Sequence, residues 1–122
     1  MAKILLAGID RAVSFPIIRA LAAGHHTIES KPIDVSPAEA ARADVILAAG
    51  EEHSYLNLLR AVHFQRPGLP FIVVSRLPET SQWLDALEAG ATDYCAAPFE
   101  PIQLQWILDT ALHNYRPPAV AA

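Results

Sequence analysis

Few residues in this 122-residue sequence combine a reactive side chain with a position suited to chemistry. Asp10 follows the first apolar run, and Glu51, Glu52 and His53 follow the run Val45–Ala49. Carboxylates and an imidazole can ligate a metal ion or transfer protons. Three consecutive side chains cannot all point at one ion without an unusual backbone, so we interpret these groups as solvated loop charges.

The remaining candidates do not form a catalytic set. Cys95 is the single cysteine, which excludes an internal disulfide, and we expect an inert buried thiol. His25 and His26 are expected to be surface turn residues. No Cys/His spacing matches a zinc site, and no nucleophile–base pair or phosphate-binding glycine loop is present. We therefore predict no enzyme activity, no metal and no cofactor.

Composition narrows the class of protein. The sequence has 52% hydrophobic and 18% charged residues, which is enough apolar area for one core. Nine Lys and Arg residues against thirteen Asp and Glu give a net charge of −4. The cations are scattered singly, so we expect no nucleic-acid partner. Every apolar run is far shorter than the roughly 20 residues of a membrane span, and no secretion signal is recognisable, so we expect a cytoplasmic protein.

Short apolar runs predict the strands. Lys3–Ala7, Val45–Ala49 and Phe71–Ser75 are continuous enough to be covered on both faces of a sheet. Residues 26–30 are more polar and predict an edge strand, and residues 92–96 predict a fifth strand.

Helical signals alternate with these runs. We predict helices over residues 15–23 with Ser14 as the N-cap, from Pro37 to about residue 43 after the capping box Ser36–Glu39, and from Tyr55 to the stop at Arg66-Pro67-Gly68. A helix over residues 80–89 would bury Leu84 and Leu87, and a last helix over 101–115 would bury Leu104, Ile107 and Leu108. Residues 116–122 are read as a tail or the start of a linker after a domain of residues 1–115.

This alternation predicts an α/β fold. Five strand–helix units give a single-domain, doubly wound, three-layer sandwich with a parallel sheet. In such a sheet the chemistry lies where the strands end, which directs attention to residues 8–10, 49–53, 75–77 and 95–98.

Residues from Pro70 to Phe99 resemble the receiver domain of bacterial response regulators. The stretch contains FIVVS, then ALEAGATDY and a final APF, which is similar to the family's A-L-x-A-G-A-x-D-Y-x-x-K-P-F pattern. The resemblance covers the rest of the chain more weakly. It implies the flavodoxin-like strand order 2-1-3-4-5 and a place in two-component (phosphorelay) signalling.

The sequence departs from the family at the residues that carry phosphoryl chemistry. The two metal-binding carboxylates fall on Gly8 and Ile9, with Asp10 one residue further on, and the phosphoacceptor falls on Ala49. The lysine of K-P-F is replaced by Ala97, whereas the switch positions keep Ser75 and Tyr94. Loss of anionic ligands weakens Mg²⁺ binding, and without the cations a phosphoryl transfer has no charge stabilisation. We expect a pseudo-receiver that cannot be phosphorylated on aspartate.

The family resemblance implies a surface for partners. Receivers use the last two helices and the strand between them for dimerisation or partner binding, and here that surface would contain Trp83, Tyr94, Gln103 and Trp106. Leu84 and Leu87 facing the sheet would turn Trp83 toward the last strand. Exposed aromatic residues often anchor such contacts. We expect a signalling partner or a second copy here.

Two alternatives to a phosphorylation-independent interaction module stay open. The small residues Gly8, Ala49, Ser75 and Ala97 could leave a cleft for a small molecule, although inward collapse of the loops would close it. A Mg²⁺-dependent phospho-receiver would need Asp10 with Glu51 or Glu52 to replace the missing carboxylates.

Overall fold

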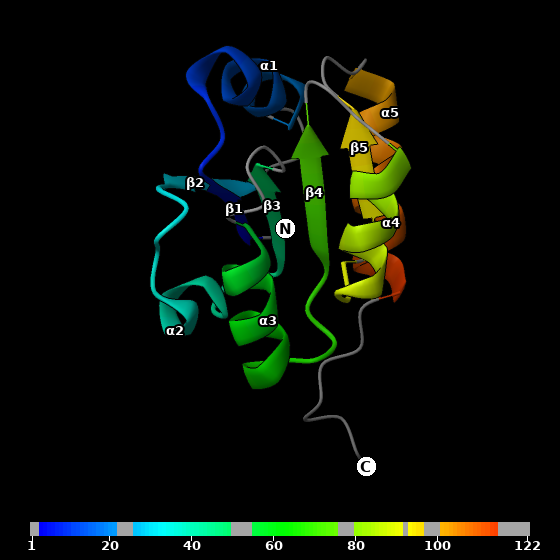
Figure 1. The fold of residues 1–122 in the computed structure, drawn as a ribbon. Helices are drawn as coiled ribbons and strands as arrows, with labels where there is room; N and C mark the ends of the chain where they lie inside the picture. The colour runs from blue at the N-terminus through cyan, green and yellow to red at the C-terminus, as the bar shows by residue number, and fades with distance from the viewer. Residues whose placement is uncertain are drawn as a thin grey trace.

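The computed structural model describes residues 3–21, 26–49, 55–75, 80–91, 93–96 and 101–114. It contains one parallel sheet in the order β2-β1-β3-β4-β5. The strands are β1 (Lys3–Ala7), β2 (Thr27–Lys31), β3 (Val45–Ala49), β4 (Phe71–Ser75) and β5 (Asp93–Ala96). The helices are α1 (Arg11–Leu21), α2 (Pro37–Ala40), α3 (Tyr55–Gln65), α4 (Thr80–Glu88) and α5 (Pro101–Asn114), and they form the outer layers (Figure 1).

Successive side chains of the central strands point to opposite faces of the sheet, which divides the core into two halves. Ile4 and Leu6 of β1 pack on the side of α1 and α5, with Ile17, Leu21 and Leu108. Leu5 and Ala7 point to the opposite side, where Leu58, Val62 and Phe71 belong to the same cluster as α2 and α4 residues. Both faces of β1, β3 and β4 are therefore covered, which explains their continuous apolar sequences.

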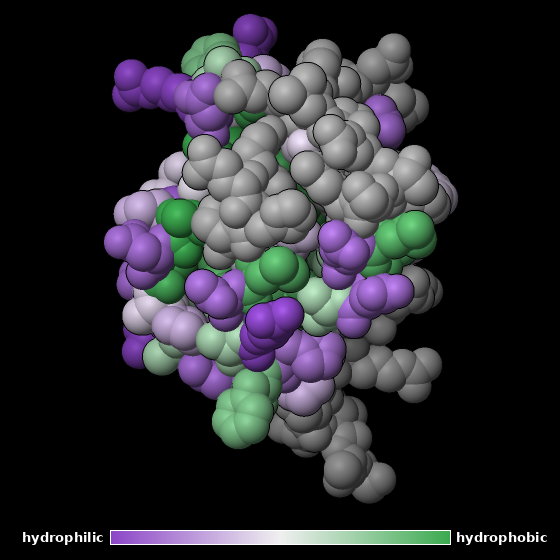
Figure 2. All heavy atoms as spheres, viewed as in Figure 1, coloured by the Kyte–Doolittle hydropathy of each residue, from purple (hydrophilic) through white to green (hydrophobic). Residues whose placement is uncertain are grey.

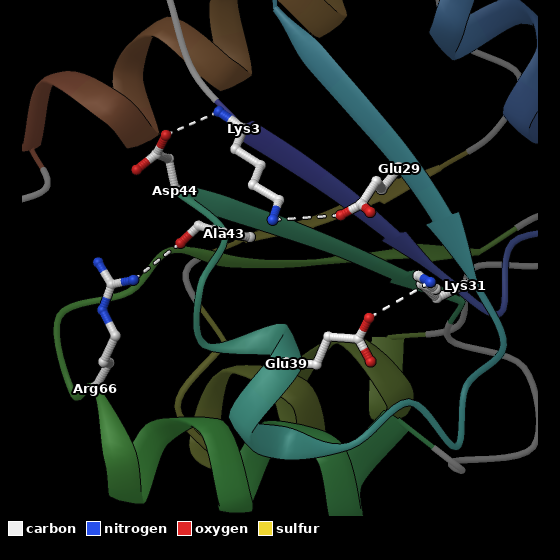
Figure 3. Close-up of polar contacts among 7 residues, drawn as sticks. All are labelled: Lys3, Glu29, Lys31, Glu39, Ala43, Asp44 and Arg66. Carbon is white, nitrogen blue, oxygen red and sulfur yellow. Dashed lines mark hydrogen bonds and ion pairs between the residues drawn. The ribbon is translucent and has the colours of Figure 1, made fainter.

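Polar contacts tie the amino ends of the strands together (Figure 3). The backbone N–H of Lys3 donates to the Asp44 carboxylate at 2.8 Å. The Arg66 guanidinium, at the end of α3, donates to the carbonyl of Ala43 at 3.0 Å and also to that of Ala41. These carbonyls follow α2, so Arg66 satisfies backbone acceptors that the short helix leaves open.

The predicted strands agree closely with the structure. β1, β3 and β4 have the expected bounds, β2 begins one residue later than expected, and it lies at the edge of the sheet. The capping box is also confirmed, since the Ser36 hydroxyl accepts from the Glu39 N–H at 3.1 Å. α2 is shorter than predicted and ends at Ala40.

The predicted start of the first helix is wrong. α1 begins at Arg11, the Asp10 carbonyl accepts its first backbone bonds from Val13 and Ser14, and Pro16 lies inside it. Ser14 is a buried helical residue and not the N-cap. The prediction placed Pro16 in the first turn, but burial of Ile17 and Leu21 stabilises the helix despite the hydrogen bond that a proline cannot donate.

The predicted orientation of the fourth helix is also wrong. Leu84 and Leu87 are 50% and 37% exposed, whereas Ala86 is buried; these residues belong to the part of α4 whose side chains the structure describes, residues 84–88. A methyl group at this position lets the helix approach the sheet closely, which two leucines would prevent. The expectation that Trp83 turns toward β5 loses its basis, and the side chains of Trp83, Tyr94, Cys95 and Leu104 lie outside the described residues.

Candidate functional site

The strand register places the sequence-derived pocket residues at one edge of the sheet. Ala7 pairs with Ala48, so Gly8 follows β1 beside the end of β3. Ala49 pairs with Val74, and Ser75 pairs with Ala96 at the end of β5. The structure thus brings Gly8, Ala49 and Ser75 to neighbouring strand ends, where the fold class places its ligands.

Gly8 has an environment that excludes a side chain. Its φ angle is +66°, a left-handed conformation that disfavours residues with a Cβ. A Cβ built at Gly8 would lie 2.8 Å from the Cβ of Ile33, in the segment between β2 and α2. The Gly8 N–H also donates to the Lys31 carbonyl at 2.8 Å, which holds this segment against the end of β1. Ile33 therefore occupies the space that an acidic side chain would need.

The other pocket residues offer little charge. Ala49 is partly buried at the end of β3 and carries only a methyl group. Ser75 is 1% exposed, and its hydroxyl is a buried polar group at the end of β4. Ile9 is partly buried against the α1 side of the core, and Asp10 is exposed immediately before α1. Ala97, Glu51, Glu52, His53 and His25 lie outside the described residues, so their predicted roles stay predictions.

Among the described residues, no three or more His, Cys, Asp or Glu side chains lie close enough together to hold a metal ion. No helix in the described part of the chain is long and apolar enough to span a membrane.

A second candidate site lies on α4 and α5. Leu84 and Leu87 are exposed on α4, and Gln103 and Trp106 are exposed on α5, where Trp106 reaches 68%. We call these four residues the α4–α5 face. Sequence reasoning included Gln103 and Trp106 but assigned the two leucines to the core, because their spacing is typical of a buried stripe.

Helix geometry places Leu87 and Gln103 on the flanks of α4 and α5 that border the edge strand β5. Asp85 and Ala89 line a hollow with Leu56 and Arg60 of α3, so that flank of α4 faces α3. Leu87 lies on the opposite flank, as expected for 100° per residue. On α5, Gln105 donates to the Ala20 carbonyl of α1 at 3.2 Å, which places Gln103 on the flank away from α1. Leu87 and Gln103 thus flank the edge strand β5. Leu84 and Trp106 point away from the sheet on its two opposite faces, because Ala86 of α4 packs in one half of the core and Ile107 of α5 in the other.

Solved structures with the same fold include receiver domains of response regulators. A CheY-like receiver domain protein from Methanospirillum hungatei has a TM-score of 0.77 and 20% identity, with 94% of this chain and 96% of that chain covered. A response regulator from Thermotoga maritima has a TM-score of 0.77 and 19% identity, with 91% and 97% covered. NtrX from Brucella abortus, in complex with ADP, has a TM-score of 0.78 and 21% identity.

The match to NtrX covers 93% of this chain and 26% of NtrX, so this chain spans about a quarter of that protein. No family model matches the sequence, and no curated protein matches it significantly. At these identities the solved structures establish the fold, which is the flavodoxin-like receiver fold that the sequence predicted.

Proposed function

We propose that this chain is a receiver domain of two-component-type signalling that works without phosphorylation and without catalysis, as a protein-interaction module. The observation that carries the proposal is the carboxyl edge of the sheet. Ala49 stands where the resemblance places the phosphoacceptor, and Gly8 stands where it places a metal-binding carboxylate. The left-handed backbone of Gly8 and its contact with Ile33 leave no room to restore that carboxylate.

The missing carboxylates, lysine and phosphoacceptor all act in one phosphorylation reaction, so each loss weakens that reaction further. Mg²⁺ takes hard oxygen ligands and binds weakly when carboxylates are missing. Phosphoryl transfer depends on cations that stabilise the charge of the moving group. An alanine has no oxygen that could become an acyl phosphate. The contact between Gly8 and Ile33 also fills part of the space that the small-molecule alternative requires.

The α4–α5 face is the proposed binding surface. An aromatic side chain buries about 150–250 Å², so covering the 68% of Trp106 that is exposed removes on the order of 100–170 Å² from water. At about 25 cal/mol per Å² this contributes roughly 3–4 kcal/mol before the entropic cost of association. Figure 2 shows hydrophobic and hydrophilic residues side by side over α4, which is the mixture expected of a reversible interface.

Intact-mass measurement after incubation with acetyl phosphate and Mg²⁺ tests the absence of phosphorylation. The expected result is an unchanged mass. An adduct of about 80 Da, the mass of one phosphoryl group, that maps to Asp10 or to residues 51–52 would refute the proposal and favour the phospho-receiver alternative.

Affinity capture followed by reconstitution with the purified partner tests the surface. We expect Trp106→Ala and Leu84→Ala to weaken binding of the identified partner at least about tenfold, as truncation of anchor residues does. Phe64→Ala is the matched control, because Phe64 is 89% exposed at the end of α3 and outside the α4–α5 face. Equal binding by all three variants would refute this surface.

A further inference from the structure

The outer side of α1 carries exposed cations next to exposed apolar residues. Phe15 and Ile18 are 59% and 39% exposed, and Arg11 and Arg19 are also exposed. Arg11, Phe15 and Arg19 are spaced four apart and Ile18 follows Phe15 by three, so the four residues form one stripe, which we call the α1 stripe. The Arg19 guanidinium lies 5.9 Å from the centre of the Phe15 ring, within range of a cation–π contact.

A hollow lies beside this stripe. It has a volume of about 420 Å³, and the described residues that line it are Phe15, Pro16, Arg19 and Ala20. Three of these contribute apolar surface and the fourth contributes a guanidinium. The hollow is open to solvent, and its apolar surface beside a guanidinium suits an aromatic residue that has an acid next to it.

The charge of α5 is opposite to that of α1. α5 carries Asp109 three residues after Trp106 and has no lysine or arginine, whereas α1 contains two arginines and no acid. The acids of α4, Asp85 and Glu88, line the hollow beside Arg60 of α3 and do not belong to this contact. Among the residues that the structure describes, the ion pairs join Lys3 to Glu29 and Lys31 to Glu39, and none engages α1, α4 or α5. The charges of both surfaces are thus available to another molecule.

We propose that the α1 stripe of one copy of this chain binds the α4–α5 face of a second copy, with Trp106 seated in the hollow on α1. This inference rests on the function proposed above, since it names a partner for the same face. Trp106 and Asp109 are three residues apart on α5, as neighbours on one side of a helix. Phe15 and Arg19 are four apart on α1, so an aromatic–acid pair meets an aromatic–arginine pair.

The two surfaces lie on different parts of the molecule. Ala20, whose carbonyl accepts from Gln105 of α5, is 100° or more around the helix from each member of the α1 stripe, so the stripe faces away from α5. The hollow extends from the stripe toward α5, because Ala20 also lines it. α4 and α5 lie on the right of Figure 1, and α1 lies at the upper left. Contact between two unlike surfaces is heterologous, so each added copy leaves a free stripe at one end and a free face at the other. Assembly then continues head to tail beyond a dimer.

Sedimentation of the 122-residue chain over a concentration series tests this assembly. We expect the wild type to form oligomers larger than dimers, which dissociate as salt is raised because charge pairing contributes to the contact. Arg19→Glu and Trp106→Ala should each weaken association at least about tenfold. Both side chains are exposed, so circular dichroism should show unchanged folding, and Phe64→Ala should assemble like the wild type.

Mixing the two defective variants gives the decisive readout. Arg19→Glu keeps an intact α4–α5 face and Trp106→Ala keeps an intact stripe, so an equimolar mixture should form a one-to-one dimer that does not grow. A monomeric wild type at every concentration would overturn the inference, as would oligomers that neither variant weakens. Loss of assembly with Trp106→Ala alone would also overturn it, while leaving the α4–α5 face and the proposed function in place.

Discussion

Replacing Gly8 with alanine tests whether the backbone of Gly8 and its contact with Ile33 leave room for a side chain after β1. The left-handed conformation at φ +66° costs a residue with a Cβ about 1–2 kcal/mol. The new Cβ would lie 2.8 Å from the Cβ of Ile33, and relieving such overpacking costs about 1–3 kcal/mol. Gly8→Ala should therefore lower the free energy of unfolding by about 2–5 kcal/mol, a large part of the 5–15 kcal/mol of a typical domain.

Double-mutant cycles in urea separate the two contributions. The atom nearest the added methyl group is the Cβ of Ile33, which Ile33→Gly removes and Ile33→Ala keeps. We expect a coupling of about 1–3 kcal/mol between Gly8→Ala and Ile33→Gly, and almost none between Gly8→Ala and Ile33→Ala. The backbone contribution should persist in both cycles.

Two results would refute this reasoning. A cost below about 1 kcal/mol for Gly8→Ala would mean that neither the strain nor the contact exists as described. Equal coupling in the two cycles would mean that the Cβ of Ile33 is not the obstacle.

Gly8→Asp should be at least as destabilising as Gly8→Ala, so restoring the carboxylate should not restore Mg²⁺ binding in a calorimetric titration.

Three further substitutions follow from contacts in the structure. Ser36→Ala removes the hydroxyl that caps α2 and should cost about 0.5–2 kcal/mol in urea unfolding, and no change would contradict the cap. Arg66→Ala leaves two backbone carbonyls after α2 without their donor and should cost about 1–3 kcal/mol, whereas the exposed Arg60→Ala should be nearly neutral. Leu108→Ala should lower the free energy of unfolding by about 2–5 kcal/mol because Leu108 is 1% exposed, and Leu84→Ala should lower it far less because Leu84 is 50% exposed. Equal melting temperatures of the two variants would contradict the orientation of α4 in the structure.

The strands could be predicted from sequence because burial on both faces constrains every residue. Val45–Ala49 and Phe71–Ser75 contain only apolar residues until Ser75, and the structure covers them on both sides. Alternation with helices predicted a parallel, doubly wound sheet, and the resemblance to receiver domains implied the strand order. The same order brings Gly8, Ala49 and Ser75 together, so the position of the candidate pocket was also predictable.

The helices were harder to predict because only part of each helix is buried. Leu84 and Leu87 have the spacing of a core pair, yet the sheet accepts Ala86 instead, because the distance between helix and sheet decides which side chain fits. This correction moved two leucines from the predicted core to the α4–α5 face. Local signals also misplaced the start of α1, where packing of Ile17 and Leu21 outweighs the cost of an internal proline.

Residue identity alone determined what this protein lacks, since no carboxylate stands at Ala49 and no conformation can supply one. Apolar runs and turn residues likewise predicted the five strands. Only the tertiary structure decided that Ile33, twenty-five positions after Gly8 in the sequence, lies against it, and which side of α1 faces α5. Such contacts depend on how segments far apart in the sequence pack together, and a local sequence pattern carries no information about that packing.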